Sequence, residues 1–127
     1  MSKNRIDAED LLLLLSESTG PQTRVRDGGL LYAAAERPEA VILGTRFYIP
    51  ISWRAAALLH SIIRWKPLDL SNAGLGWRAV AALIGIHGRR LVMPARDRMS
   101  MTDDINAGRL DDVEETASRL DPFLQTR

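Results

Sequence analysis

Cysteine is absent from the 127-residue chain, and its absence excludes several classes of site at once. Without a thiol there is no disulfide framework, no thiolate zinc centre, no iron–sulfur cluster and no cysteine nucleophile. Histidine is almost as scarce, because His60 and His87 are the only two. Two histidines without cysteine leave a zinc site short of ligands. We interpret His60 as a packed helix residue and His87 as a helix C-terminal cap.

Long apolar runs are also missing. No run approaches the roughly 20 residues of a membrane span, and the five leucines at 11–15 are too few, with acidic flanks, for the core of a signal peptide. We therefore expect a cytoplasmic protein that does not contact membranes. The composition, 46% hydrophobic and 26% charged, is ordinary for a globular protein of this length, so residues 1–127 are expected to form a single domain.

Neither charge sign is in excess, since 17 basic and 16 acidic residues give a net charge of +1. The charges are unevenly distributed, because residues 51–100 carry 8 basic and 2 acidic residues whereas residues 101–127 carry 3 and 7. Four of the basic residues form a cluster, Arg89, Arg90, Arg96 and Arg98. No aromatic residue is interleaved with them, which disfavours nucleic-acid binding. We interpret the cluster as a solvated face, with an acidic partner or a phosphate as the alternative ligand.

Helical segments separated by glycine and proline fill most of the chain. Capping residues stand at Asp7, Asp27, Ser52 and Asp111. The leucines at 11–15 lie on every side of the first helix, so other elements should cover most of it, and the helix should end at 19–21. The remaining helices are expected at about 30–35, 53–65, 75–87, 97–107 and from Asp111 to 124. This pattern predicts an all-α fold, a compact bundle of about six helices.

One segment departs from the helical pattern. Between 39 and 50, β-branched and aromatic residues stand on both sides of Gly44. Such a sequence is typical of a loop or a short hairpin. A loop is also expected at 66–74, between the two most apolar helices.

Two stretches of the chain match a known pattern. The first is Val25-Arg26-Asp27-x-Gly29-Leu30-Leu31 with x-Ala34-x-x-Arg37-Pro38, and the second is Ala55-Ala56-Ala57-Leu58-Leu59-His60-Ser61-Ile62. Together they resemble the death-on-curing (Doc) toxins of the Fic/Doc family, over about residues 6–124. The resemblance implies an all-α toxin encoded beside a short antitoxin. Members transfer a phosphate or a nucleotide monophosphate to a hydroxyl group of a target protein, in the Doc branch a translation elongation factor.

The resemblance places the family's chemistry at 66–74, Lys66-Pro67-Leu68-Asp69-Leu70-Ser71-Asn72-Ala73-Gly74. The family motif reads His-x-Phe-x-(Asp/Glu)-(Gly/Ala)-Asn-(Gly/Lys)-Arg, with His as general base, the acid as magnesium ligand, and the loop amides, Asn and Arg as phosphate ligands. Here Lys66 replaces the His, Leu70 the acid and Gly74 the Arg. A lysine that stays protonated is a poor base, and leucine cannot bind magnesium. We therefore expect a degenerate motif without the standard transfer activity.

The individual roles still have candidates. Lys66 is the candidate catalytic residue, at the family's His position, and also a reasonable phosphate ligand. No metal ligand is assigned at the position of the family's acid; Asp69, next to Leu70, is the candidate if the loop register shifts by one. In the family an extended flap before the central helix docks the target by strand addition, which assigns target docking to Phe47 and Tyr48. The candidate nucleotide and phosphate ligands are Ser71, Asn72, Gly74 and Arg78.

Three functions follow from these observations. The first is a Doc-like toxin of a bacterial toxin–antitoxin pair that binds its antitoxin but has lost the standard reaction. The second is an active transferase that moves phosphate or AMP to a translation-related protein, and only this function requires ATP and Mg²⁺. The third is a non-catalytic module that binds an antitoxin helix.

Overall fold

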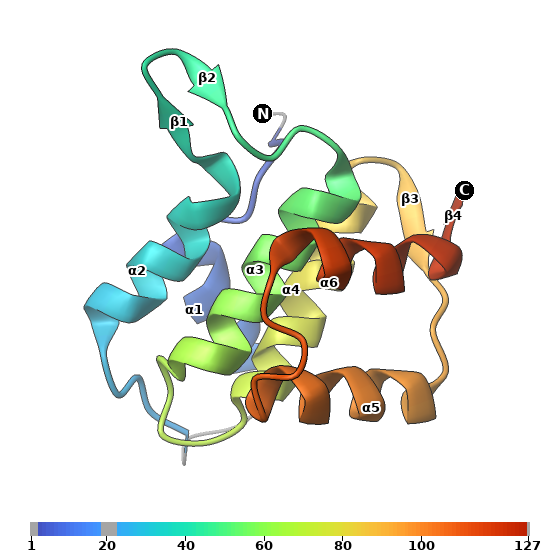
Figure 1. Cartoon of the computed structure of the whole chain (residues 1–127). Helices are drawn as coiled ribbons and strands as arrows, with labels where there is room; N and C mark the ends of the chain where they lie inside the picture. The colour runs from blue at the N-terminus through green and yellow to red at the C-terminus, as the bar shows by residue number, and fades with distance from the viewer. Residues whose placement is uncertain (1–2, 19–22, 127) are drawn as a thin grey trace.

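The computed structural model describes residues 3–18 and 23–126. Within these residues the chain forms six α-helices, as predicted, and two very small antiparallel sheets (Figure 1). The predicted end of the first helix, at Thr19, Gly20 and Pro21, lies outside the described residues. No helix in the described part of the chain has the length and apolar character to span a membrane. The helices are α1 (Ala8–Ser18), α2 (Gly28–Glu36), α3 (Ile51–Trp65), α4 (Asn72–Ile86), α5 (Ala95–Asn106) and α6 (Val113–Leu120).

Helix α3 is the centre of the bundle, with α2, α4, α5 and α6 packed around it (Figure 1). Its side chains are buried from Arg54 to Ile63 without interruption. Gly76 lets α4 approach α3 closely, because a Cβ atom there would lie 3.1 Å from Cδ1 of Leu59. The two apolar helices predicted on either side of the loop thus form the main core contact, and the loop joins their ends.

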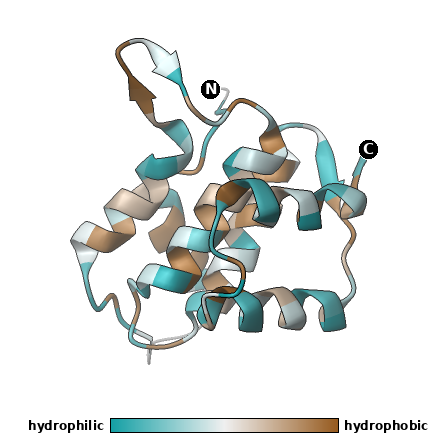
Figure 2. Ribbon diagram, in the orientation of Figure 1, coloured by the Kyte–Doolittle hydropathy of each residue, from teal (hydrophilic) through white to brown (hydrophobic). Residues whose placement is uncertain are grey.

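The segment before α3 is a hairpin, which confirms the prediction for residues 39–50. Strand β1 (Val41–Ile42) pairs with β2 (Thr45–Arg46) through a two-residue turn. Leu43 and Gly44 have φ values of 50° and 77°, as a tight hairpin turn requires. The hairpin projects from the body of the protein, and its first strand is apolar (Figure 2).

A second sheet, near the C-terminus, was not predicted. Strand β3 (Arg89–Leu91) pairs with β4 (Leu124–Thr126). The last helix was expected to reach residue 124 but ends at Leu120, and a 3₁₀ turn, η3 (Asp121–Phe123), follows it. Pro122 cannot donate a helical hydrogen bond, which explains the early end. Two members of the arginine cluster, Arg89 and Arg90, therefore lie on a strand.

Several predicted helix ends are shifted by one to three residues. Helix α3 follows Pro50, and Ser52, predicted as its cap, is buried within the first turn. Asp112 rather than Asp111 caps α6, and its side chain accepts from the N–H of Glu115 at 2.7 Å. Helix α4 begins at Asn72, not at residue 75. Asp7 and Asp27 cap their helices as predicted.

Helix α1 is less covered than predicted. Leu12 and Leu13 are 46% and 61% exposed, whereas Leu11 is fully buried. Only one side of this helix faces α2 and α4. A run of leucines thus does not by itself require burial on all sides.

Candidate functional site

The loop between α3 and α4 is held in shape at both ends by left-handed residues. Lys66 follows α3 with φ 52°, and Ser71 precedes α4 with φ 62°. Between them Pro67 and Leu68 are buried, and Leu70 is 55% exposed. The loop is therefore anchored in the middle and exposed near the start of α4.

The side chain of Lys66 turns back toward the helix ends beside it. Its Nζ donates to the carbonyl oxygen of Ile63 at 3.1 Å and to Oδ1 of Asn106 at 2.8 Å. A cation at a helix C-terminus is favoured by the helix dipole. The ammonium group is thus already paired with the ends of α3 and α5.

The side-chain amide of Asn72 is also hydrogen-bonded within the protein, to the backbone of the loop. Its Oδ1 accepts from the N–H of Leu68 at 2.9 Å, and its Nδ2 donates to the Leu68 carbonyl oxygen at 3.1 Å. The amide therefore satisfies both backbone groups of a residue that is only 1% exposed. Buried backbone groups require such partners. In this structure Asn72 stabilises the loop.

The segment 24–27, just before α2, forms hydrogen bonds with the loop. The N–H groups of Arg26 and Asp27 donate to the Pro67 carbonyl oxygen at 2.7 and 3.0 Å. The Arg26 side chain also donates to the carbonyl oxygens of Trp65 and Lys66. Asp69 Oδ1 accepts from the N–H of Arg24 at 2.9 Å. The carboxylate of Asp69 thus contacts the 24–27 segment.

The remaining predicted ligands lie just before α4 and on its surface. Ser71, Gly74 and Arg78 are exposed, and Arg78 lies one turn beyond Gly74. Among the described residues the Arg78 side chain makes no hydrogen bond or ion pair, so nothing directs it toward the loop. The described residues also contain no group of three or more His, Cys, Asp and Glu that could hold a metal ion. The structure brings Lys66, Ser71, Asn72 and Gly74 to one end of the α3–α4 pair, and Arg78 lies one turn further along α4.

The residues predicted to dock a target lie where the hairpin meets α3. Phe47 is 50% exposed, whereas Tyr48 is partly buried and packs against the core. The most exposed apolar residues of this region are Val41, Ile42, Leu43, Phe47 and Ile49. Leu43, at the tip, is 100% exposed. The hairpin therefore presents an apolar surface larger than the two predicted residues.

A buried ionic network at the base of the hairpin was missed by the sequence analysis. Arg54, on α3, has a side chain only 7% exposed and donates to Glu39 Oε2 and to the Asn4 carbonyl oxygen, each at 2.7 Å. Glu39 also accepts from Arg46 on the hairpin. An arginine within a mostly apolar helix was the signal that could have found it.

His60 is a packed helix residue, as predicted, and its ring contacts residues from two other parts of the chain. Arg37 NH1 lies 3.0 Å from its Nδ1, and Asp111 Oδ1 lies 3.2 Å from its Nε2. Because arginine can only donate, Nδ1 must accept, and Nε2 carries the proton. Burial, together with the Arg37 guanidinium, holds the pKa of His60 below its ordinary value, although Asp111 acts in the opposite direction.

Lowering the pH should therefore reduce the free energy of unfolding, because His60 binds a proton more readily in the unfolded chain. In the unfolded chain the imidazole binds a proton as the pH falls below about 6.5, whereas in the fold it binds one only at lower pH. The contribution of His60 to stability is thus present above pH about 6.5 and is lost as the pH falls through the folded pKa. Urea unfolding at pH 7.5 and 5.0 should show a larger loss for the natural chain than for His60→Gln. Equal losses would contradict this assignment.

A comparison with known proteins gives the chain a relative. The chain is 38% identical over 86 residues to Toxin Doc of Mycolicibacterium smegmatis, a match that covers 68% of this chain. The match spans 66% of the length of that relative. No family model matches the chain, and no solved structure matches it.

Proposed function

The chain belongs to the Doc family of toxins, and on this premise we propose that it is the toxin component of a bacterial toxin–antitoxin pair whose catalytic loop has lost the standard transfer reaction. Its partners are then a cognate antitoxin and a target among the translation factors. The family relationship supports the toxin assignment, and the residues Lys66, Leu70 and Gly74 at the positions of the family motif support the loss of the reaction.

The observation that carries the proposal is that the polar side chains of the loop are hydrogen-bonded to other groups of the protein. Lys66, Asp69 and Asn72 all bind backbone or side-chain groups of the protein itself. These contacts leave one of the three ammonium N–H groups of Lys66 and one of the two amide N–H groups of Asn72 for a phosphate ligand, so the loop side chains offer it few donors. The loop is thus built to hold α3, α4 and the 24–27 segment together.

The residues present do not fit ATP with Mg²⁺. Leu70, at the position of the family's acid, offers no side-chain oxygen ligand, and the neighbouring Asp69 accepts from the Arg24 backbone. Gly74, at the position of the family's arginine, offers no guanidinium for bidentate contact with phosphate. No reaction step through a bound nucleotide is therefore assigned to this chain.

Calorimetric titration of ATP with Mg²⁺ tests this proposal. We expect the natural chain to bind with a Kd weaker than about 1 mM and to leave bacterial growth unaffected on expression. Magnesium-dependent binding below about 1 mM that disappears in Asn72→Ala would contradict the proposal and support an active transferase. Circular dichroism of Asn72→Ala would establish that the variant is folded.

The exposed hairpin supports retained binding of a protein partner. A strand edge flanked by apolar side chains is a typical surface for strand addition. We propose that the hairpin docks a segment of the translation-factor target through Phe47 and its exposed apolar neighbours.

Substitution at the hairpin tip should weaken this binding. Leu43→Asp places a charge on the docking surface without a packing cost, because Leu43 is fully exposed. Calorimetry with a purified bacterial translation elongation factor should show affinity reduced by about tenfold or more. Leu13→Asp, on the exposed side of α1, is the matched control and should bind normally. Equal effects of the two substitutions would argue against docking on the hairpin.

A further inference from the structure

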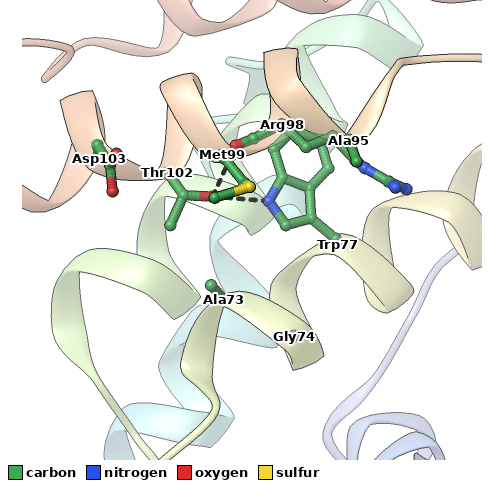
Figure 3. Close-up of a pocket in the computed structure, with 8 residues that line it drawn as sticks. All are labelled: Ala73, Gly74, Trp77, Ala95, Arg98, Met99, Thr102 and Asp103. Carbon is green, nitrogen blue, oxygen red and sulfur yellow. Dashed lines mark hydrogen bonds between the residues drawn. The ribbon is translucent and has the colours of Figure 1, made fainter.

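A pocket of about 410 Å³ lies between α4 and α5, outside the loop contacts described above. Its wall is formed from α4 by Ala73, Gly74 and Trp77, and from α5 by Ala95, Arg98, Met99, Thr102 and Asp103 (Figure 3). Its volume is within the range of small-molecule sites, and most of its lining is apolar. The pocket is therefore large enough for a single aromatic ring or for two fused rings.

The absence of a side chain at Gly74 helps to open this pocket. A Cβ atom at Gly74 would meet nothing within 4 Å. A longer side chain would extend from the helix surface into space that now belongs to the pocket. The family's arginine position is thus part of a cavity wall in this chain.

Trp77 provides a flat apolar surface with its polar atom already satisfied. Its Nε1 donates to Thr102 Oγ1 at 2.9 Å, and Thr102 donates in turn to the Arg98 carbonyl oxygen at 2.8 Å. These two bonds fix the indole between the helices. Met99 lines the same pocket as the indole (Figure 3), and it is 67% exposed. An aromatic ring is the ligand that such a surface favours.

The charges of the pocket lie at opposite ends. In Figure 3 the guanidinium of Arg98 extends past Trp77, and Asp103 lies at the other end of the pocket. Among the described residues the Arg98 guanidinium has no hydrogen-bond or ion-pair partner. An unpaired arginine beside an apolar wall favours an anionic group on the ligand.

We propose that this pocket binds a small aromatic acid, with its ring against Trp77 and Met99 and its anionic group on Arg98. The site needs neither the loop 66–71 nor a metal ion. The inference is therefore independent of the proposed function, and either one can fail without the other.

Calorimetry with naphthalene-1-sulfonate tests the site directly. We expect saturable binding that is about tenfold tighter than binding of the neutral 1-naphthylmethanol, because only the sulfonate can pair with Arg98. In proton–nitrogen spectra the indole N–H signal of Trp77, assigned with Trp77→Phe, should shift with the same saturation. The signals of Trp53 and Trp65 should stay in place. Equal affinity for the two probes, or no shift at Trp77, would overturn the proposal.

Two pairs of variants separate this site from general surface binding. Gly74→Leu should fill the pocket and reduce affinity by about tenfold or more, whereas Ala81→Leu, at an exposed position of α4 outside the pocket, should bind normally. Arg98→Gln should remove the preference for the sulfonate, whereas Arg96→Gln should retain it. Normal binding by Gly74→Leu would overturn the proposal, and thermal unfolding would confirm that each variant is folded.

Discussion

Replacing Arg54 with alanine is expected to lower the free energy of unfolding by about 3–5 kcal/mol, because it breaks a buried ion pair. The guanidinium lies 2.7 Å from Glu39 Oε2, and the two side chains are only 7% and 13% exposed. The substitution leaves the Glu39 carboxylate with Arg46 as its remaining ionic partner and removes the bond to the Asn4 carbonyl oxygen. Urea unfolding followed by circular dichroism measures the loss.

Arg46→Ala is the matched control for this experiment. It removes a contact to the same carboxylate, but the Arg46 side chain is 37% exposed. An exposed ion pair contributes about 0–1 kcal/mol, so the expected loss is correspondingly small. The double variant Arg54→Met with Glu39→Leu should recover part of the stability, since it replaces both members of the buried ion pair with apolar side chains. A loss below about 1 kcal/mol for Arg54→Ala would show that the network contributes little.

Restoring the family motif is expected to produce the largest change in activity. The triple variant Lys66→His, Leu70→Asp and Gly74→Arg should bind ATP with Mg²⁺ below about 1 mM and arrest growth on expression. The structure favours folding of this variant, because Leu70 is 55% exposed and a Cβ at Gly74 has free space. Histidine also tolerates the left-handed conformation that Lys66 adopts at φ 52°. The same titration and growth assay as for the natural chain measure both effects.

A double variant separates nucleotide binding from catalysis. Leu70→Asp with Gly74→Arg keeps Lys66, so it should bind the nucleotide but transfer it about 10²–10⁴-fold more slowly than the triple variant. Growth arrest by the natural chain would contradict the proposed loss of activity. A folded triple variant that binds no nucleotide would show that more than these three residues separates the chain from its active relatives.

The helices could be predicted because their signals are local. Asp7 and Asp27 cap helices through bonds within one turn, and Gly88 and Gly108 stand beyond helix ends with φ values of 74° and 78°. The sheet of β3 and β4 could not be predicted this way. Its strands are separated by more than 30 residues and are paired by the tertiary fold. Helix α4 likewise gains its first turn from the loop contacts of Asn72.

The position of the candidate site followed from the sequence, but the contacts of its residues did not. Spacing placed Lys66 and Asn72 in a loop between two apolar helices; Lys66 lies there, whereas Asn72 is the first residue of α4. Their hydrogen-bond partners include Asn106, which is 40 residues away from Lys66. Arg24 and Asp69 meet across 45 residues. Such pairs depend on how the bundle closes, and no local pattern encodes them. The roles of Lys66, Asp69 and Asn72 toward a ligand stay predictions.

The hairpin strands are too short to offer a docked partner many backbone hydrogen bonds. Each strand has two residues, so an added strand would gain one or two backbone hydrogen bonds, or about 1–3 kcal/mol. Burying Leu43, Phe47 and Ile49 would contribute about 1.5–3 kcal/mol for each fully buried side chain. Apolar contact therefore outweighs the backbone contribution. Selectivity at this edge would rest on the size and spacing of the partner's apolar side chains, and a partner could dock there without forming a long strand.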